Sequence, residues 1–160
     1  MSVQEKERAL FAVRDRIAAQ GDVPVEALGH SDRVFVAIWM LEAELNNGGF
    51  SQWMFNSDGD HAEFSVAALH REVGAEQAAR VCERFFCYLP GGRPLPEQNA
   101  RQGQLDAAIA ALGAGSFEDA CLVLEKEFYA LEDDLRDRLL AFSEAAERAH
   151  RDVDLAALES

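Results

Sequence analysis

The sequence has few cysteines and none of the spacings that hold metal ions. Cys82, Cys87 and Cys121 are odd in number and form no CxxC pair, so they indicate neither a disulfide framework nor a zinc site. There is no HExxH motif or Glu-x-x-His pair, and the acidic segment DGDHAE at residues 58–63 lacks the twelve-residue calcium loop. We therefore expect buried, reduced thiols, no metal and no cofactor.

Signatures of enzymes are missing as well. No GxSxG or Cys-His signature is present, and no GxxxxGK[ST] loop follows the glycine pair at Gly48 and Gly49, so no nucleophilic or phosphate-binding site is indicated. Glu42 and Glu44 are two residues apart on a predicted helix and point to different sides, which argues against an acid/base pair. We expect no catalytic activity.

Long apolar runs and positive charge are also scarce. The longest apolar run, VFVAIWML at residues 34–41, is far shorter than the roughly 20 residues that a membrane-spanning helix needs. The first residues contain no apolar signal segment, so we expect a cytoplasmic protein without a membrane partner. Lysines and arginines number 15 against 29 acids, which gives a formal charge of −14. Such a charge repels a phosphate backbone, so we expect no direct binding of nucleic acid.

What the sequence does contain is apolar residues at helical spacing. Leu10, Val13 and Ile17 fall three and four apart, and similar stripes recur along the chain, whereas no period-2 pattern predicts a strand. With 160 residues and 49% hydrophobic content, the chain is long enough for one core and short for two. We predict a single compact all-α domain over residues 1–160, with fraying from about residue 152.

Two predicted helices stand out. Over residues 34–45 apolar side chains run almost all the way round, so we expect this helix to be central, with Ser31 as its N-cap. A long C-terminal helical segment is expected from an N-cap at Ser116 to about residue 149, with a break near Tyr129.

Residues 44–60, ELNNGGFSQWMFNSDGD, interrupt the helices with two asparagines, a glycine pair and a second polar turn. Asn-Asn-Gly-Gly can leave a helix through left-handed conformations, and the carboxylate of Glu44 can accept its free N–H groups. Phe50 and Trp53 then recur at helical spacing, which predicts a short helix packed on the core. We interpret the stretch as architectural, and expect changes at Gly48 or Glu44 to destabilise the fold. The predicted motif residues are Glu44, Asn46, Asn47, Gly48, Gly49, Phe50, Trp53, Asn56 and Gly59.

This stretch, followed by a helix that ends in HREVGA at residues 70–75, resembles the signature of a bacterial domain of unknown function whose best-known member is a DNA-mimic protein. The likeness extends more loosely over about residues 33–142 and includes LEKEFYALEDDL at residues 124–135, where the family more often has Asp at the position of Glu125. The resemblance implies an all-helical, acidic and often dimeric protein. In the characterised case the mimic occupies the DNA-binding surface of a transcription factor, so the implied partner is a basic DNA-binding protein.

Negative charge is concentrated toward the C-terminus. Residues 116–160 hold 13 acids and 5 bases, a net charge of −8, against −6 for residues 1–115. On a helical wheel, acids of the last helix share one side, opposite its apolar face. The predicted partner-binding residues are Asp133, Asp137, Glu144 and Glu147 on this side, together with Glu132, Asp134, Glu118, Asp119 and Leu140.

The acidic side of the last helix is too sparse to imitate DNA alone. It is about 21 Å long at about 1.5 Å per residue, and it carries one charge per about 5 Å, against one phosphate per about 1.7 Å of duplex. Mimicry therefore needs acids of other helices or a second protomer. Leu140 lies on this side, where an aliphatic side chain needs cover from another helix, a second protomer or a partner.

Two functions remain open from the sequence. The first is an acidic DNA mimic that blocks a basic DNA-binding protein. The second is an interaction or immunity-type module that recognises its partner by shape and apolar contact, with the acids serving solubility.

Overall fold

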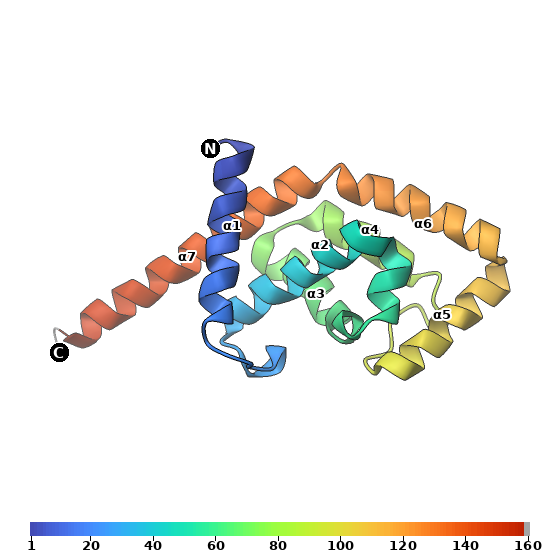
Figure 1. Ribbon diagram of the computed structural model, residues 1–160, viewed down its shortest axis with the longest axis horizontal. Coiled ribbons are helices and arrows are strands. Elements are labelled where there is room, and N and C mark those ends of the chain that lie inside the picture. Colours follow the sequence, from blue (N-terminus) through green and yellow to red (C-terminus); the bar gives the residue numbers. More distant parts are fainter. Residues whose placement is uncertain (159–160) are drawn as a thin grey trace.

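The computed structural model describes the backbone of residues 1–158 and the side chains of residues 1–153, and within these limits it contains helices and no strand, as the sequence predicts (Figure 1). A 3₁₀ turn at Val25–Ala27, another at Ser57–His61 and a π turn at Leu69–Val73 lie between the longer helices. The longer helices are α1 (Val3–Ala18), α2 (His30–Phe55), α3 (Ala62–Ala68), α4 (Glu76–Phe86), α5 (Gln98–Leu112), α6 (Ala114–Tyr129) and α7 (Glu132–Leu158).

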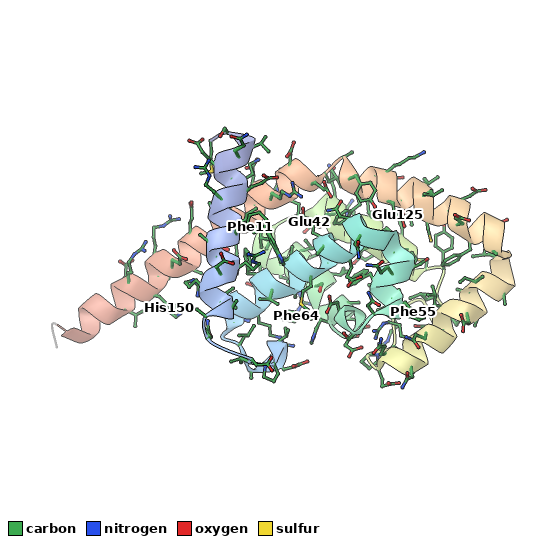
Figure 2. All side chains as sticks on the ribbon, in the orientation of Figure 1. Phe11, Glu42, Phe55, Phe64, Glu125 and His150 are labelled. Atoms are coloured by element: carbon green, nitrogen blue, oxygen red, sulfur yellow. The ribbon has the colours of Figure 1, made fainter. Side chains whose placement is uncertain are left out.

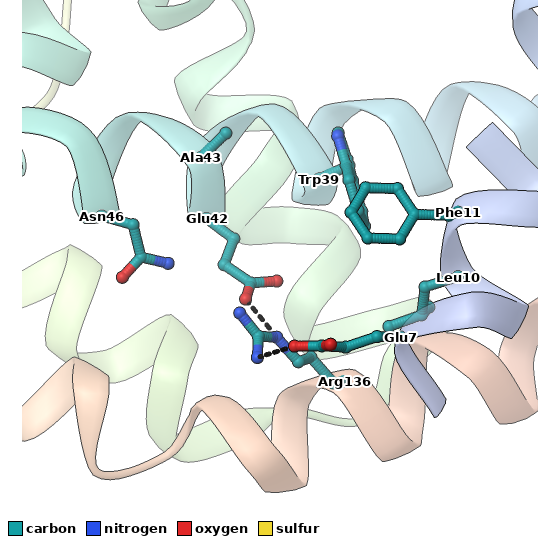
Figure 3. A pocket seen from close by; sticks show the side chains of 8 residues that line it. All are labelled: Glu7, Leu10, Phe11, Trp39, Glu42, Ala43, Asn46 and Arg136. Carbon is teal, nitrogen blue, oxygen red and sulfur yellow. Dashed lines mark hydrogen bonds and ion pairs between the residues drawn. The ribbon is translucent and has the colours of Figure 1, made fainter. Parts of the chain in front are cut away.

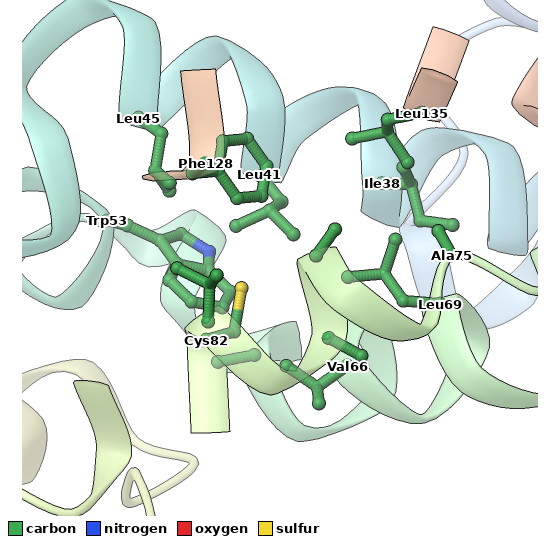
Figure 4. Packing of buried hydrophobic residues seen from close by; sticks show 14 of the residues in the cluster. Ile38, Leu41, Leu45, Trp53, Val66, Leu69, Ala75, Cys82, Phe128 and Leu135 are labelled. Carbon is green, nitrogen blue, oxygen red and sulfur yellow. The ribbon is translucent and has the colours of Figure 1, made fainter. Parts of the chain in front are cut away.

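The central position of α2 confirms the prediction made from its apolar circumference. This helix contacts α3, α5, α6 and α7, and Leu41, Leu45 and Trp53 are completely buried. Figure 4 shows Leu41 and Leu45 beside Phe128, and Leu69 further along the same cluster of buried side chains. One core therefore joins the helices that precede and follow α2.

Two of the three thiols are buried as expected. Burial raises the pKa of Cys121 to about 11, and Cys82 is fully enclosed in the core. The expectation is wrong for Cys87, which is exposed. This residue is the C-cap of α4, where the chain leaves the packed face of the helix.

Some helix boundaries differ from those predicted. Ser31 and Ser116 are not N-caps, because α2 begins at His30 after Gly29, and α6 begins at Ala114 after a glycine. Glycine is an acceptable N-cap residue without a side-chain bond. The break near Tyr129 is confirmed, since α6 ends there. α7 continues past the expected point of fraying to Leu158, and residues 159–160 lie outside the described part.

Within residues 1–158 no single helix is long and apolar enough to cross a membrane. Only taken together do α5 and α6 have the length and apolar composition of a membrane span, and the two helices are bent by 109° relative to each other.

The predicted elbow is a kink inside α2. Gly49 has φ 75° and ψ −168°, a conformation that is essentially restricted to glycine, whereas Gly48 has an extended φ of −162°. Asn46 and Asn47 stay helical, and among the described residues no residue other than glycine has a positive φ. The prediction of left-handed asparagines is therefore wrong, because the two glycines make the turn and of these only Gly49 has a positive φ. Phe50 and Trp53 begin a second helical segment that is buried.

The carboxylate that accepts the freed backbone N–H at the kink belongs to Glu125, and not to Glu44 as predicted. The N–H of Phe50 donates to Oε1 of Glu125 at 3.0 Å. Figure 2 labels Glu125, which lies on α6. A Cβ on Gly49 would lie 2.0 Å from this oxygen, so only glycine lets the carboxylate approach. Glu125 thus caps the second segment of α2 from α6, and its negative charge faces the positive end of that segment.

Glu44 instead clamps the two segments of α2 together. Its Oε2 accepts hydrogen bonds from Gln52 Nε2 at 2.8 Å and from Asn56 Nδ2 at 2.9 Å. Both donors follow the kink, whereas Glu44 precedes it. Glu44 therefore binds side chains beyond the kink, and not the backbone of the turn as predicted, and its architectural role remains a prediction.

The carboxyl end of α2 is held by Arg101 of α5, which the sequence analysis did not single out. Its side chain is fully buried. Nε donates to the carbonyl of Met54 at 2.8 Å, Nη2 donates to the carbonyl of Asn56 at 2.6 Å, and Nη1 donates to the carbonyl of Leu95 at 3.0 Å. Nη2 also pairs with Asp60 at 2.8 Å. One guanidinium therefore joins α2, the following turn and the loop before α5.

The motif residue Gly59 makes room for this guanidinium. A Cβ on Gly59 would lie 2.6 Å from Arg101 Nε and 2.4 Å from the carbonyl oxygen of Trp53. Its predicted structural role therefore comes from close packing.

His70, in the π turn at Leu69–Val73, is expected to titrate above the usual histidine range. Its Nε2 lies 2.8 Å from Oε1 of Glu83, and its Nδ1 lies 2.8 Å from Oε2 of Glu76. The hydrogen bond to Glu83, followed by that to Glu76, holds the pKa of the imidazole above its ordinary value. The protonated ring therefore stabilises the fold fully below the unfolded-state pKa of about 6.5, and this contribution is lost as pH rises through the higher folded-state pKa.

An NMR titration of the His70 ring protons measures this directly. His70→Ala should flatten the pH dependence of the melting temperature at pH values above about 6.5, relative to the parent. A ring that titrates at or below the ordinary histidine value would show that the two carboxylates do not hold the proton.

Candidate partner-binding surface

α6 and α7 follow one another along one side of the molecule (Figure 1). Both helices carry exposed carboxylates, which we call the acidic edge. It consists of Glu118, Asp119, Asp133, Asp134, Asp137 and Glu144. From Glu118 to Glu144 the two helix axes add up to about 35 Å at about 1.5 Å per residue, close to one turn of duplex DNA, at about 34–36 Å. The charge is still sparse, with one carboxylate per about 6 Å against one phosphate per about 1.7 Å.

Helix α1 crosses α7 (Figure 1), and its basic side chains reach two acids that the wheel places on the acidic side of α7. Lys6 pairs with Asp137 at 2.6 Å, and Arg16 lies 3.5 Å from Glu147. Leu140 lies between these two acids along α7 and is only 6% exposed. Leu140 is thus covered by residues of the same chain, and it needs no second protomer or partner for this cover. Leu140 is therefore corrected from a predicted partner contact to a core residue.

Several acids of the edge have a basic neighbour within the chain. Asp134 pairs with Arg138 at 2.7 Å, and Glu144 lies 4.0 Å from Arg148. Such exposed pairs contribute little to stability, but each base offsets the field of its acid. Among the described residues, Glu118, Asp119 and Asp133 take part in no ion pair. These three acids carry the least compensated charge of the edge.

Glu132 faces inward and is half-buried. Its Oε1 is buried and has no hydrogen-bond partner among the described residues. Its charge acts on the pair formed by buried Glu42 and half-buried Arg136, whose Oε1 and Nε lie 2.5 Å apart. Of the predicted partner-binding acids, Glu132 is thus the one whose carboxylate faces this pair instead of open solvent.

Exposed apolar residues lie on α6 among the acids of the edge. Leu122 is 45% exposed and Val123 is 56% exposed. The sequence analysis did not single them out, although both fall outside the buried stripe of α6, which includes Cys121 and Leu124. A helical wheel of residues 114–129 could have identified them. They give this surface an apolar component beside the charge.

The acidic segment at residues 58–63 sends its side chains to separate neighbours. Asp60 pairs with Arg101, and His61 lies 3.5 Å from Glu26. Burial and the nearby charge of Glu44 raise the pKa of Asp58. Within the described part of the chain no three His, Cys, Asp or Glu residues are grouped to hold a metal ion.

A family model described as DMP19-like protein matches residues 26–148 of the chain. No curated protein and no solved structure matches it. The matched range begins after α1 and runs into α7, so it includes the kink of α2 and the whole acidic edge.

Proposed function

This chain belongs to the DMP19-like protein family, and we propose on this basis that it acts as a DNA mimic. It binds a basic DNA-binding protein, such as a transcription factor, and blocks the surface with which that protein holds DNA. The acidic edge carries this proposal, because it combines the length of about one duplex turn with exposed carboxylates. No catalytic step and no cofactor is part of the proposal.

Long-range electrostatics would bring the two proteins together. A formal charge of −14 attracts a basic surface before contact, and this attraction is screened beyond about 10 Å at 0.1 M salt. The charge density of one edge is below that of duplex DNA, and a second protomer in a homodimer would add a second edge. The same charge argues against direct binding of DNA by this protein.

The exposed apolar pair Leu122 and Val123 favours a second candidate function. In this alternative the protein is an interaction or immunity-type module, and its partner recognises the shape and apolar surface of α6. Both candidates use neighbouring parts of the same surface, so they are separated by whether charge or apolar area dominates the affinity.

The DNA-mimic proposal predicts that reversing charge on the edge weakens the complex by about 10- to 100-fold. The variant Glu118→Lys, Asp119→Lys and Glu144→Lys changes exposed residues beyond the first turn of their helices, so the fold should be nearly unaffected. The partner is recovered from the native host by pull-down, with excess duplex DNA as competitor, and affinity is then measured against salt. Affinity should fall steeply as salt rises.

A matched control makes the same total charge change elsewhere. Asp22→Lys, Glu26→Lys and Glu63→Lys alter exposed acids of the α1–α2 loop and α3, and should change affinity far less. If the edge variant keeps full affinity while Leu122→Ser with Val123→Ser abolishes it, the second candidate is correct and the DNA-mimic proposal is wrong.

A further inference from the structure

A pocket of about 190 Å³ lies between α1, α2 and α7 (Figure 3). This volume is below the range of about 300–1,000 Å³ that is typical of small-molecule sites, and it suits a single long side chain. Its apolar side is formed by Leu10, Phe11 and Trp39. Its polar side is formed by Glu7, Glu42 and Arg136.

A buried carboxylate with a free oxygen forms the polar floor of the pocket. Glu42 is only 5% exposed, and its Oε1 accepts a hydrogen bond from Nε of Arg136 at 2.5 Å. Its Oε2 accepts no hydrogen bond from any side chain or backbone group in the described part of the chain. Figure 3 shows this oxygen directed away from Arg136, toward the side where Trp39 and Phe11 lie. A buried carboxylate gains from a second donor at such an oxygen.

Negative charge exceeds positive charge around the pocket. Glu7 lies 4.0 Å from Arg136, whose guanidinium already pairs with Glu42. Burial alone would lower the pKa of Arg136, but Glu42, Glu132 and Glu7 together raise it above the ordinary arginine value. Three carboxylates thus surround one guanidinium, so a cationic guest is favoured over an anionic one.

The aromatic wall of the pocket is suited to a guanidinium. The rings of Phe11 and Trp39 meet edge to face, with centroids 5.4 Å apart. The guanidinium of Arg14 lies 4.7 Å from the Phe11 centroid and 6.0 Å from the Trp39 centroid, although Arg14 does not line the pocket. This aromatic pair therefore already attracts one guanidinium outside the pocket, as flat cations favour aromatic faces.

We propose that the pocket receives one arginine side chain of the basic partner. Its guanidinium would donate to Oε2 of Glu42 and to Glu7, and its aliphatic stem would pack on the aromatic wall. The inference rests on the proposed function, because the guest belongs to that partner. The pocket adjoins the acidic edge, since Glu7 follows Lys6, which pairs with Asp137. α1 supplies part of the pocket and lies outside the residues matched by the family model.

Binding can be tested on the free protein with a blocked Gly-Arg-Gly peptide. The indole N–H signal of Trp39 in an NMR spectrum reports the pocket, and that of Trp53, which is fully buried, is an internal reference. We expect a saturable shift at Trp39 with a dissociation constant on the order of 1 mM. The same peptide with citrulline, which keeps the shape but loses the charge, should bind at least about tenfold more weakly.

Two variants locate the site. Glu7→Gln should weaken binding of the arginine peptide by about three- to tenfold. Phe11→Leu should also weaken this binding, because the aromatic face is lost. Asp22→Asn, an exposed acid that does not line the pocket, should leave binding unchanged. The Trp53 signal checks that each variant is folded.

Equal binding of the arginine and citrulline peptides, or no shift at Trp39 with either peptide at tens of millimolar, would overturn the inference. Equal binding of a lysine peptide would overturn its preference for arginine. If the peptide does not bind while a partner is still captured and displaced by DNA, only the inference about the pocket is contradicted. If the peptide binds but no captured partner competes with DNA, the proposed function falls and the pocket stands.

Discussion

Arg101→Met is expected to lower the free energy of unfolding by about 3 to 5 kcal/mol, the range for breaking a buried charged network. Methionine keeps an unbranched apolar stem, but it is shorter than arginine and has no hydrogen-bond donor. It would leave the carbonyls of Met54, Asn56 and Leu95, which now accept hydrogen bonds from the guanidinium, with fewer partners or none. Buried acceptors without a donor are unfavourable. A loss of 1 kcal/mol lowers the melting temperature of a chain of this size by about 2–4 °C, so the melting temperature of this variant should fall by roughly 10 °C.

Arg101→Lys separates charge from geometry. An ammonium keeps the attraction to Asp60 but cannot reach three carbonyls at once, because its donors lie on a single nitrogen. We expect lysine to restore less than half of the lost stability in a denaturant titration. Arg138→Met, at an exposed arginine whose Nε donates to Asp134, is the matched control and should lower stability by less than about 1 kcal/mol. Melting of Arg101→Met close to that of the parent would contradict the assigned role.

Helical periodicity predicts much of the fold because it reports which side of each helix is buried. The apolar circumference of residues 34–45 placed α2 at the centre, and Phe50 and Trp53 were correctly assigned to a packed segment after the elbow. Periodicity does not report which helices pack together. Contacts between distant parts of the chain therefore had to come from the structure.

The kink illustrates this limit. The sequence shows that a carboxylate is needed near the glycine pair, and Glu44 is the nearest candidate. The acceptor is Glu125, which is 75 residues away from Phe50, and only the packing of α6 on α2 brings the two together. Arg101 was missed for a related reason, since an arginine is normally exposed and its sequence neighbours do not reveal the carbonyl groups that it contacts.

The acidic side of α7 shows why a single helical wheel is insufficient for a surface. The wheel correctly finds Leu140 out of place among acids, but it contains no information about α1. Lys6 and Arg16 reach acids on either side of Leu140 along α7. Part of the predicted partner surface is thus an intramolecular contact, and the acids of α6 gain importance in its place.

Gly49→Ala is expected to destabilise the protein by about 3 to 5 kcal/mol, through two effects that add. Its φ of 75° and ψ of −168° lie where a residue with a Cβ is strained by about 1 to 3 kcal/mol. The new Cβ would also lie 2.0 Å from Oε1 of Glu125, so the carboxylate must withdraw from the N–H of Phe50. Loss of a hydrogen bond to a charged group removes about 1.5 to 3 kcal/mol.

Gly48→Ala is the matched control, one residue earlier in the same kink. Gly48 has an extended φ of −162°, which any residue adopts. Its new Cβ would lie 2.1 Å from Oε1 at the end of the Gln52 side chain and 2.9 Å from Gln52 Cβ. The end of the side chain can rotate away with the loss of one hydrogen bond to Glu44, and the approach to Gln52 Cβ requires a small backbone shift. We expect a loss of about 1 to 2 kcal/mol, measured by denaturant titration beside Gly49→Ala. Partner affinity per folded molecule should be unchanged in both variants, because neither substitution removes a carboxylate of the acidic edge, although Gly48 lines the same hollow as Glu118. If Gly49→Ala melted like the parent but no longer bound the partner, the motif would be a recognition site, and its architectural role would be wrong.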